Sequence, residues 1–174
     1  MHTQILKRMF CLILPLFLVV AIAISAIDLG LRNSATPQGI VSFEFCAFTS
    51  SCDLALNHWG AKGQALAMLS LGIDYLFLIL YPGLMCIGFL LLLARLPPGL
   101  ASVTLWMAWF CLVISVADAI ENYALIKIIL NESGNGYGLL AGIFAVIKFA
   151  FLGVTLAWLL FVSARYMFWA RPKT

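Results

Sequence analysis

Four long apolar stretches dominate the sequence and restrict the folds that the chain can adopt. They cover residues 9–28, 65–94, 101–130 and 138–162. About 20 apolar residues in a helix cross the ~30 Å of hydrocarbon in a bilayer. Backbone polar groups in that layer are satisfied only in helices and closed barrels. The sequence therefore predicts an all-α protein that crosses the membrane four times, as a single integral membrane domain over residues 1–174.

The charged residues are few, and this supports the same class. They make up 10% of the chain, whereas soluble domains contain about 25%. No long polar run is present that would form a separate soluble domain. The net charge of +3 comes from scattered residues, which excludes a nucleic-acid-binding patch. The partner that the composition predicts is the lipid bilayer.

The first apolar stretch can be interpreted in two ways. Lys7 and Arg8 precede it, and residues 24–26 resemble a cleavage site, as in a secretory signal peptide. Its apolar core is longer than the roughly 7–15 residues that are usual in such peptides. We therefore expect a retained transmembrane helix, in which Pro15 is a point where the helix can bend.

Basic residues near the ends of the stretches predict the orientation of the chain. Those on one side are Lys7, Arg8, Arg95, Arg165, Arg171 and Lys173, and those on the other are Arg32, Lys62 and, if it is counted there, Lys127. Loops rich in Lys and Arg stay on the cytoplasmic side. This rule predicts a multi-pass protein of the cell (inner) membrane with both its N-terminus and its C-terminus in the cytoplasm.

The connections between the stretches predict how the helices pack. Short turns at residues 95–99 and 131–136 join the last three stretches, which favours an antiparallel four-helix bundle. Residues 30–64 form one outer loop of about 35 residues. In it, the β-branched and aromatic residues 40–45 predict a short extended segment. Asp53 is a plausible N-cap for a short helix through Trp59 that ends near Gly60, and such a helix would lie at the membrane interface with Trp59 as an aromatic anchor.

Two of the five cysteines lie in this outer loop. Cys46 and Cys52 can form a disulfide bond if the loop faces an oxidising compartment. Cys11, Cys86 and Cys111 fall inside the apolar stretches, where cysteine acts as a small core residue. Quinone-coupled thiol oxidoreductases with four helices resemble this chain in length. They carry a second cysteine pair in the other outer loop, which is absent here, so a redox enzyme is not the interpretation that we favour.

Polar residues inside the third stretch mark the candidate site. Asp118, Glu121 and Asn122 lie with Ser115 within an arc of roughly 120° on a helix. Polar groups in hydrocarbon are costly, so this face is expected to point at partners or water inside the bundle.

Residues of two other stretches are expected to reach the same level of the membrane. At about 1.5 Å per residue, Asp74, Asp118, Glu121 and Lys148 lie roughly 9–18 Å below the outer boundary. Lys148 shares its helix face with the small residues Gly138, Ala141, Gly142 and Ala145, which favours close helix packing and an inward lysine. Tyr81 is placed to join the site. Pro82 leaves the carbonyl near Leu78 without its helical partner, which predicts a kink.

Three acids and one base in one site leave three interpretations open. The cluster can bind a ligand, lipid group or cation, it can carry out proton chemistry, or Lys148 can pair with Asp118 or Glu121 only to fix the helix register. The candidate ligand-binding residues are Asp74, Asp118, Glu121, Asn122, Lys148 and Tyr81.

Sequence motifs for several enzyme classes are absent. The chain has no Gly-rich phosphate loop, no H-E-x-x-H and no G-x-S-x-G. His2 and His58 are its two histidines, and neither is expected to be a metal ligand. We therefore predict no metal and no cofactor.

Two short segments carry a resemblance to known sequences. Residues 71–77 (LGIDYLF) and 117–122 (ADAIEN), with a Trp-bearing loop before the first, resemble a broad group of small bacterial four-span membrane proteins of unknown activity. The resemblance covers most of the chain from Phe43 onward. It implies the four-helix arrangement and singles out Asp74, Asp118, Glu121 and Asn122, but it implies no activity.

Three functional hypotheses follow from these observations. The first is a non-enzymatic protein that binds a small apolar ligand, a lipid group or a cation, with a role in transport as one form of it. The second is an accessory subunit of a membrane complex, whose charged cluster only fixes the bundle and whose surface binds another membrane protein. The third is a membrane enzyme that uses a buried acid for proton transfer on an apolar substrate.

Overall fold

The structure is a computed structural model that describes residues 2–49, 51–93, 95–131 and 136–169. The described residues form helices and connecting turns, with no strand among them. The helices are α1 (His2–Leu29), α2 (Ile40–Glu44), α3 (Cys46–Thr49), α4 (Cys52–Leu93), α5 (Pro98–Ile129) and α6 (Tyr137–Trp169). The prediction of an all-α protein is confirmed.

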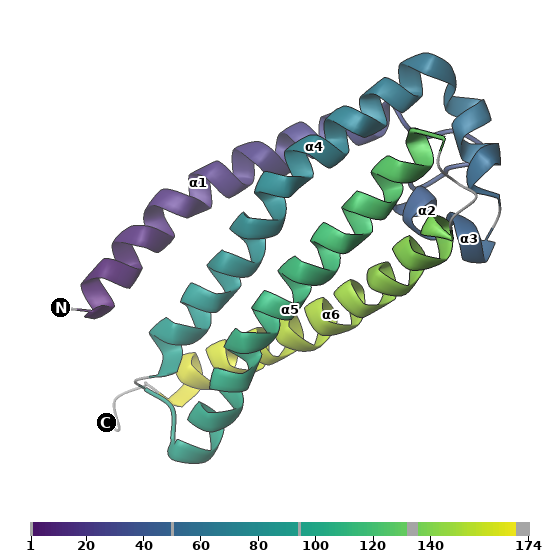
Figure 1. The fold of residues 1–174 in the computed structure, drawn as a ribbon. Helices are drawn as coiled ribbons and strands as arrows, with labels where there is room; N and C mark the ends of the chain where they lie inside the picture. The colour runs from purple at the N-terminus through teal and green to yellow at the C-terminus, as the bar shows by residue number, and fades with distance from the viewer. Residues whose placement is uncertain (1, 50, 94, 132–135, 170–174) are drawn as a thin grey trace.

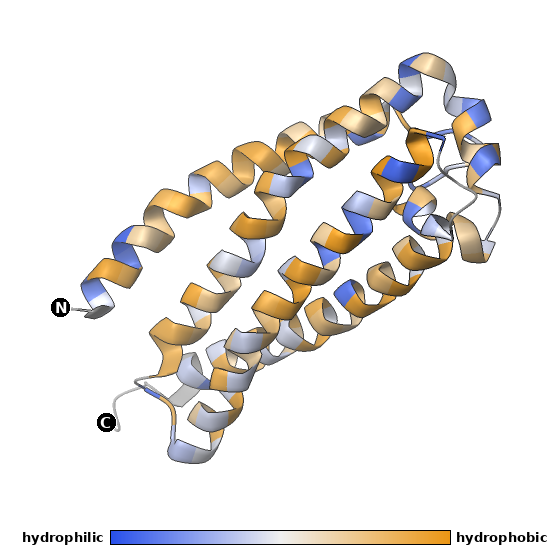
Figure 2. Ribbon diagram, in the orientation of Figure 1, coloured by the Kyte–Doolittle hydropathy of each residue, from blue (hydrophilic) through white to orange (hydrophobic). Residues whose placement is uncertain are grey.

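Four of these helices, α1, α4, α5 and α6, are long and apolar enough to cross a membrane. This confirms the four apolar spans. Each helix continues beyond the apolar stretch that predicted it, and α4 does so most, because it begins at Cys52 and not near residue 65. Figure 2 shows that apolar residues cover most of these helices, while hydrophilic residues lie in the region of α2 and α3, near the N-terminal end of α1 and at a few positions within α5 and α6.

The long helices lie side by side in chain order, and each runs opposite to the one before it (Figure 1). The extensive contacts are those of α1 with α4, α4 with α5, and α5 with α6. Among the described residues, α1 makes no comparable contact with α6. The arrangement is therefore open along one side, between α1 and α6, which the sequence did not predict.

One end of the molecule carries a small group of turns and short helical segments, residues 30–49 and 51–59, which we call the cap (Figure 1). The extended segment expected at residues 40–45 was wrong, because residues 40–44 form α2. The side chain of Asp28, at the end of α1, accepts a hydrogen bond from the Ile40 backbone N–H at 2.8 Å. A carboxylate at the first turn of a helix satisfies a free N–H donor and opposes the helix dipole. The tertiary contact thus overrides the local β propensity.

The core of the cap forms around two aromatic rings. Phe43 is fully buried, and its ring centroid lies 4.9 Å from that of Trp59. The Trp59 indole N–H donates to the Leu31 carbonyl at 2.8 Å and to the Thr36 hydroxyl at 3.0 Å. Only 8% of Trp59 is exposed. The expected aromatic anchor is therefore wrong, since this tryptophan packs inside the cap.

Two features connect the cap to α4. A disulfide bond joins Cys46 of α3 to Cys52 at the start of α4. At Gly60 the backbone adopts a positive φ of 57°, and α4 is kinked there. Glycine reaches this conformation without steric cost because it has no Cβ. The helix expected to end near Gly60 is thus the first part of α4, bent away from the transmembrane part.

Candidate functional site

A buried lysine lies at the centre of the candidate site. Lys148 of α6 is 7% exposed, and its Nζ lies 3.1 Å from Oδ1 of Asp118 and 2.9 Å from Glu121. Both acids come from α5, as the sequence predicted from their shared helix face. Asp118 and Glu121 are themselves almost fully buried. A charge in hydrocarbon is tolerated when it is paired, and here the pairing joins α6 to α5.

A third carboxylate, Glu44, reaches the same lysine from the cap. Its Oε2 lies 3.5 Å from the Lys148 Nζ, and the residue is 7% exposed. Burial raises the pKa of the Glu44 carboxyl above its usual value, and the Lys148 ammonium opposes that rise. Sequence reasoning missed Glu44, because residues 40–45 were assigned to an extended segment of the outer loop. The one available signal is an acid among the apolar residues of that segment.

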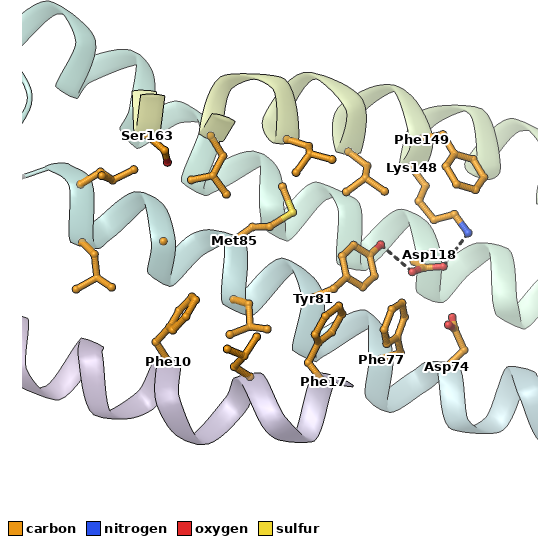
Figure 3. Close-up of a pocket in the computed structure, with 18 of the residues that line it drawn as sticks. Phe10, Phe17, Asp74, Phe77, Tyr81, Met85, Asp118, Lys148, Phe149 and Ser163 are labelled. Atoms are coloured by element: carbon orange, nitrogen blue, oxygen red, sulfur yellow. Dashed lines mark hydrogen bonds and ion pairs between the residues drawn. The ribbon is translucent and has the colours of Figure 1, made fainter. Parts of the chain in front are cut away.

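Tyr81 of α4 completes the polar contacts of Asp118. Its hydroxyl donates to Oδ2 of Asp118 at 2.9 Å, while Oδ1 of the same carboxylate faces Lys148 (Figure 3). Both oxygens of Asp118 are therefore occupied. The tyrosine also connects α4 to the pair of helices that the lysine joins.

Asp74 lies apart from the lysine. Its Oδ2 accepts a hydrogen bond from the Asn122 side chain at 2.6 Å. Figure 3 shows Asp74 next to Phe77, facing the space between the helices, while Asp118 and Lys148 lie across from it. The structure thus brings together Asp118, Glu121, Lys148 and Tyr81, and it places Asp74 and Asn122 in a neighbouring pair.

Small residues on α6 let the cap pack closely against this helix near Lys148. Ala141 and Ala145 are fully buried. A Cβ on Gly142 would come within 2.4 Å of the Phe48 ring of α3, and a Cβ on Gly138 would meet the Cys52 sulfur at 3.2 Å. Gly138 and Gly142 therefore leave the space on α6 in which the cap packs. Close approach of the cap is what allows Glu44 to reach the lysine.

The Leu78 carbonyl of α4, which was predicted to lack its helical donor, has a hydrogen-bond donor on α5. Pro82 has no N–H to donate to Leu78, and the Ser115 hydroxyl donates to the Leu78 carbonyl at 2.8 Å. The same hydroxyl lies 3.2 Å from the Cys111 carbonyl of its own helix. One hydroxyl thus satisfies a backbone group that the proline leaves open.

We expect Ser115→Ala to lower the free energy of unfolding by about 1 kcal/mol, because the Leu78 carbonyl loses its donor. The measurement is a reversible unfolding titration in mixed detergent micelles. Pro82→Ala restores an N–H one turn away, so the serine substitution should cost less in that background. Equal costs of Ser115→Ala in the two backgrounds would contradict the proposed link between the proline and the serine.

A cavity of about 770 Å³ begins at the charged cluster and continues between the helices. Glu44, Asp74, Asp118 and Lys148 line its polar end, and Ser163 lines the region toward the other end of α6 (Figure 3). The lining between them is apolar: Phe10, Leu14 and Phe17 of α1, Phe77, Leu84, Met85, Gly88, Leu91 and Leu92 of α4, and Phe149, Leu152, Leu156 and Leu159 of α6. The cavity occupies the open side between α1 and α6.

The chemistry of the site is that of charge pairing and hydrogen bonding. In the described part of the chain, no group of three or more His, Cys, Asp or Glu side chains is arranged to hold a metal ion. The acids of the cluster surround an ammonium group instead. Comparisons with protein-family models, with curated proteins and with solved structures find no match for this chain.

Proposed function

We propose that this protein binds a single-chain amphiphile within the membrane, with the apolar chain in the cavity and the polar head at the charged cluster. The observation that supports this most is the cavity itself, which is apolar over most of its lining and charged at one end. Ligand sites are typically concave and apolar, with a few placed polar groups that orient the ligand. A cluster that served only as a helix clamp would need no cavity beside it.

The length of the cavity suits one hydrocarbon chain. On α6 the lining runs from Lys148 to Ser163, which corresponds to about 22 Å at ~1.5 Å per residue. One leaflet of the bilayer is about 15 Å thick in its hydrocarbon part. The cavity can therefore hold a chain that reaches from the level of the cluster across the midplane.

The open side between α1 and α6 offers the ligand a route from the bilayer into the cavity. Because α1 and α6 do not close on each other, the cavity faces the hydrocarbon of the bilayer. α1 packs mainly on α4, and Leu12, Val19 and Ile22 remain largely exposed. An amphiphile already dissolved in the membrane can enter between α1 and α6 without leaving it.

We place the cap on the outer side of the inner membrane, with both termini in the cytoplasm. The disulfide of Cys46 and Cys52 supports this orientation, since such bonds persist in oxidising compartments. The basic residues Lys7, Arg8 and Arg95 near the opposite end support it as well. The head of the ligand would then lie toward the outer leaflet.

A blocked cavity tests the proposal. Leu156→Trp places a large ring in the lining, and it should reduce the binding of a hexadecyl amphiphile about tenfold or more by excluding its chain. Binding is measured by native mass spectrometry of the protein released from phosphatidylcholine nanodiscs. The matched control is Leu160→Trp, one turn along α6, because Leu160 is 63% exposed and is not part of the lining. Equal binding by the two variants would exclude the cavity as the site.

A further inference from the structure

The donor side chains of the cluster already face acids, and this restricts the head group of the ligand. A lysine ammonium has three N–H donors. Lys148 donates to Asp118 at 3.1 Å and to Glu121 at 2.9 Å, and Oε2 of Glu44 lies 3.5 Å from the same Nζ as an ion pair without a hydrogen bond. The Tyr81 hydroxyl donates to Asp118, and the Asn122 amide donates to Asp74. An anionic head group would therefore approach a lysine that already lies within 4 Å of three carboxylates.

Acceptors, in contrast, remain open toward the cavity. Glu44 is 7% exposed, its Oε2 has no hydrogen-bond partner, and its side chain lines the cavity. Asp74 also lines the cavity and uses Oδ2 for Asn122, which leaves Oδ1 for another donor. A buried carboxylate oxygen without a donor is costly. A ligand that supplies N–H groups here would remove that cost.

The numbers of acidic and basic groups in the site also favour a cationic head group. Glu44, Asp74, Asp118 and Glu121 contribute four carboxyl groups within the described residues of the site, and Lys148 contributes one ammonium group. A second ammonium group would give these acids a second cationic partner. An anionic head group would instead lie beside four carboxyl groups, in a medium that screens charge poorly.

Aromatic rings next to the acids fit the same ligand. The Phe77 and Tyr81 ring centroids are 5.1 Å apart, and Phe17 of α1 stacks on Phe77 at 5.4 Å. All three rings line the cavity where its polar end meets its apolar part. The faces of aromatic rings attract cations, and their apolar surface packs against a hydrocarbon chain.

We infer that the ligand is a cationic single-chain amphiphile with a protonated primary amine, which donates to Glu44 and Asp74 while its chain lies along α6. This inference rests on the proposed function and adds the chemical class of the head group. A primary amine is specified because both open acceptors call for N–H donors, which a quaternary ammonium lacks.

Four probes with one chain length separate the head groups: hexadecylamine, hexadecyltrimethylammonium, hexadecyl sulfate and hexadecanol. Each is added at the same mole fraction to phosphatidylcholine nanodiscs that contain the full chain, and the bound fraction is measured by native mass spectrometry. The amine is expected to bind at least tenfold more tightly than the sulfate and the alcohol, and more tightly than the quaternary ammonium.

Two variants assign the binding to the open acceptors. Asp74→Asn and Glu44→Gln should each weaken amine binding about tenfold and leave binding of the alcohol within about twofold, because each removes one charged acceptor. Both substitutions keep the size of the side chain. Asp53→Asn is the matched control, since Asp53 is an exposed acid of the cap outside the cavity.

The outcomes distinguish this inference from the proposed function. Sulfate or alcohol binding as tightly as the amine, with all of it lost in Leu156→Trp, would overturn the inference and keep the amphiphile site. Quaternary ammonium binding as tightly as the amine would overturn the assignment of Glu44 and Asp74 as hydrogen-bond acceptors. Failure of all four probes to bind would reject both the proposed function and the inference.

Discussion

Replacing Lys148 with methionine is expected to lower the free energy of unfolding by about 3–5 kcal/mol. The substitution keeps much of the volume of the side chain but removes the cation that faces Glu44, Asp118 and Glu121. These carboxyl groups are buried, so they must either stay charged without a partner or take up protons. The measurement is reversible unfolding in mixed detergent micelles, followed by circular dichroism.

Two further variants show whether the loss comes from the unpaired acids. Lys62→Met removes an exposed lysine of α4 and should change the free energy of unfolding by less than about 0.5 kcal/mol. Adding Glu121→Gln to Lys148→Met should recover part of the lost stability, because one fewer carboxylate then lacks a cation. A loss in Lys148→Met below about 1 kcal/mol would contradict the central place of the lysine in the fold.

Phe43→Ala is expected to have a comparable effect, of about 3–5 kcal/mol, through the cap. The Phe43 ring is fully buried against Trp59, and its removal leaves a void between α2 and α4. Because Glu44 follows it on α2, loosening the helix should also draw this carboxylate away from Lys148. The measurements are thermal unfolding and the hydrogen exchange of the backbone amides of residues 40–44.

The control for this variant is Leu54→Ala, since Leu54 lies in the same cap but is 44% exposed. It should cost well under 1 kcal/mol and leave the exchange of α2 unchanged. If Phe43→Ala left the amides of α2 as protected as in the wild type, the aromatic pair would not be what holds this helix. The cap would then depend on its disulfide and on the Asp28 contact.

Much of the transmembrane fold could be predicted because a bilayer allows few solutions. Four apolar stretches gave four long helices, and helical periodicity was enough to place Asp118 and Glu121 on one face. Depth counting then placed Lys148 at their level, and the structure joins the three. These predictions use regular geometry within single helices, which a sequence reports directly.

The parts that were missed depend on contacts between distant segments. The helical form of α2 rests on Asp28, twelve residues before Ile40, and the buried position of Glu44 rests on that helix. The burial of Trp59 rests on acceptors at Leu31 and Thr36. None of these pairings leaves a periodic pattern. The open side between α1 and α6 was missed for the same reason, since it is a property of how whole helices pack.

For the proposed amphiphile site, that open side changes how an affinity has to be defined. A ligand that enters between α1 and α6 comes from the bilayer, so its occupancy follows its mole fraction among the lipids. Chain length then acts mainly through partitioning, at about 0.8 kcal/mol for each methylene that leaves water. Two amphiphiles with very different solubilities can fill the cavity equally once both are dissolved in the membrane. Exchange would be set by lateral diffusion, and dilution of the surrounding water would not empty the site.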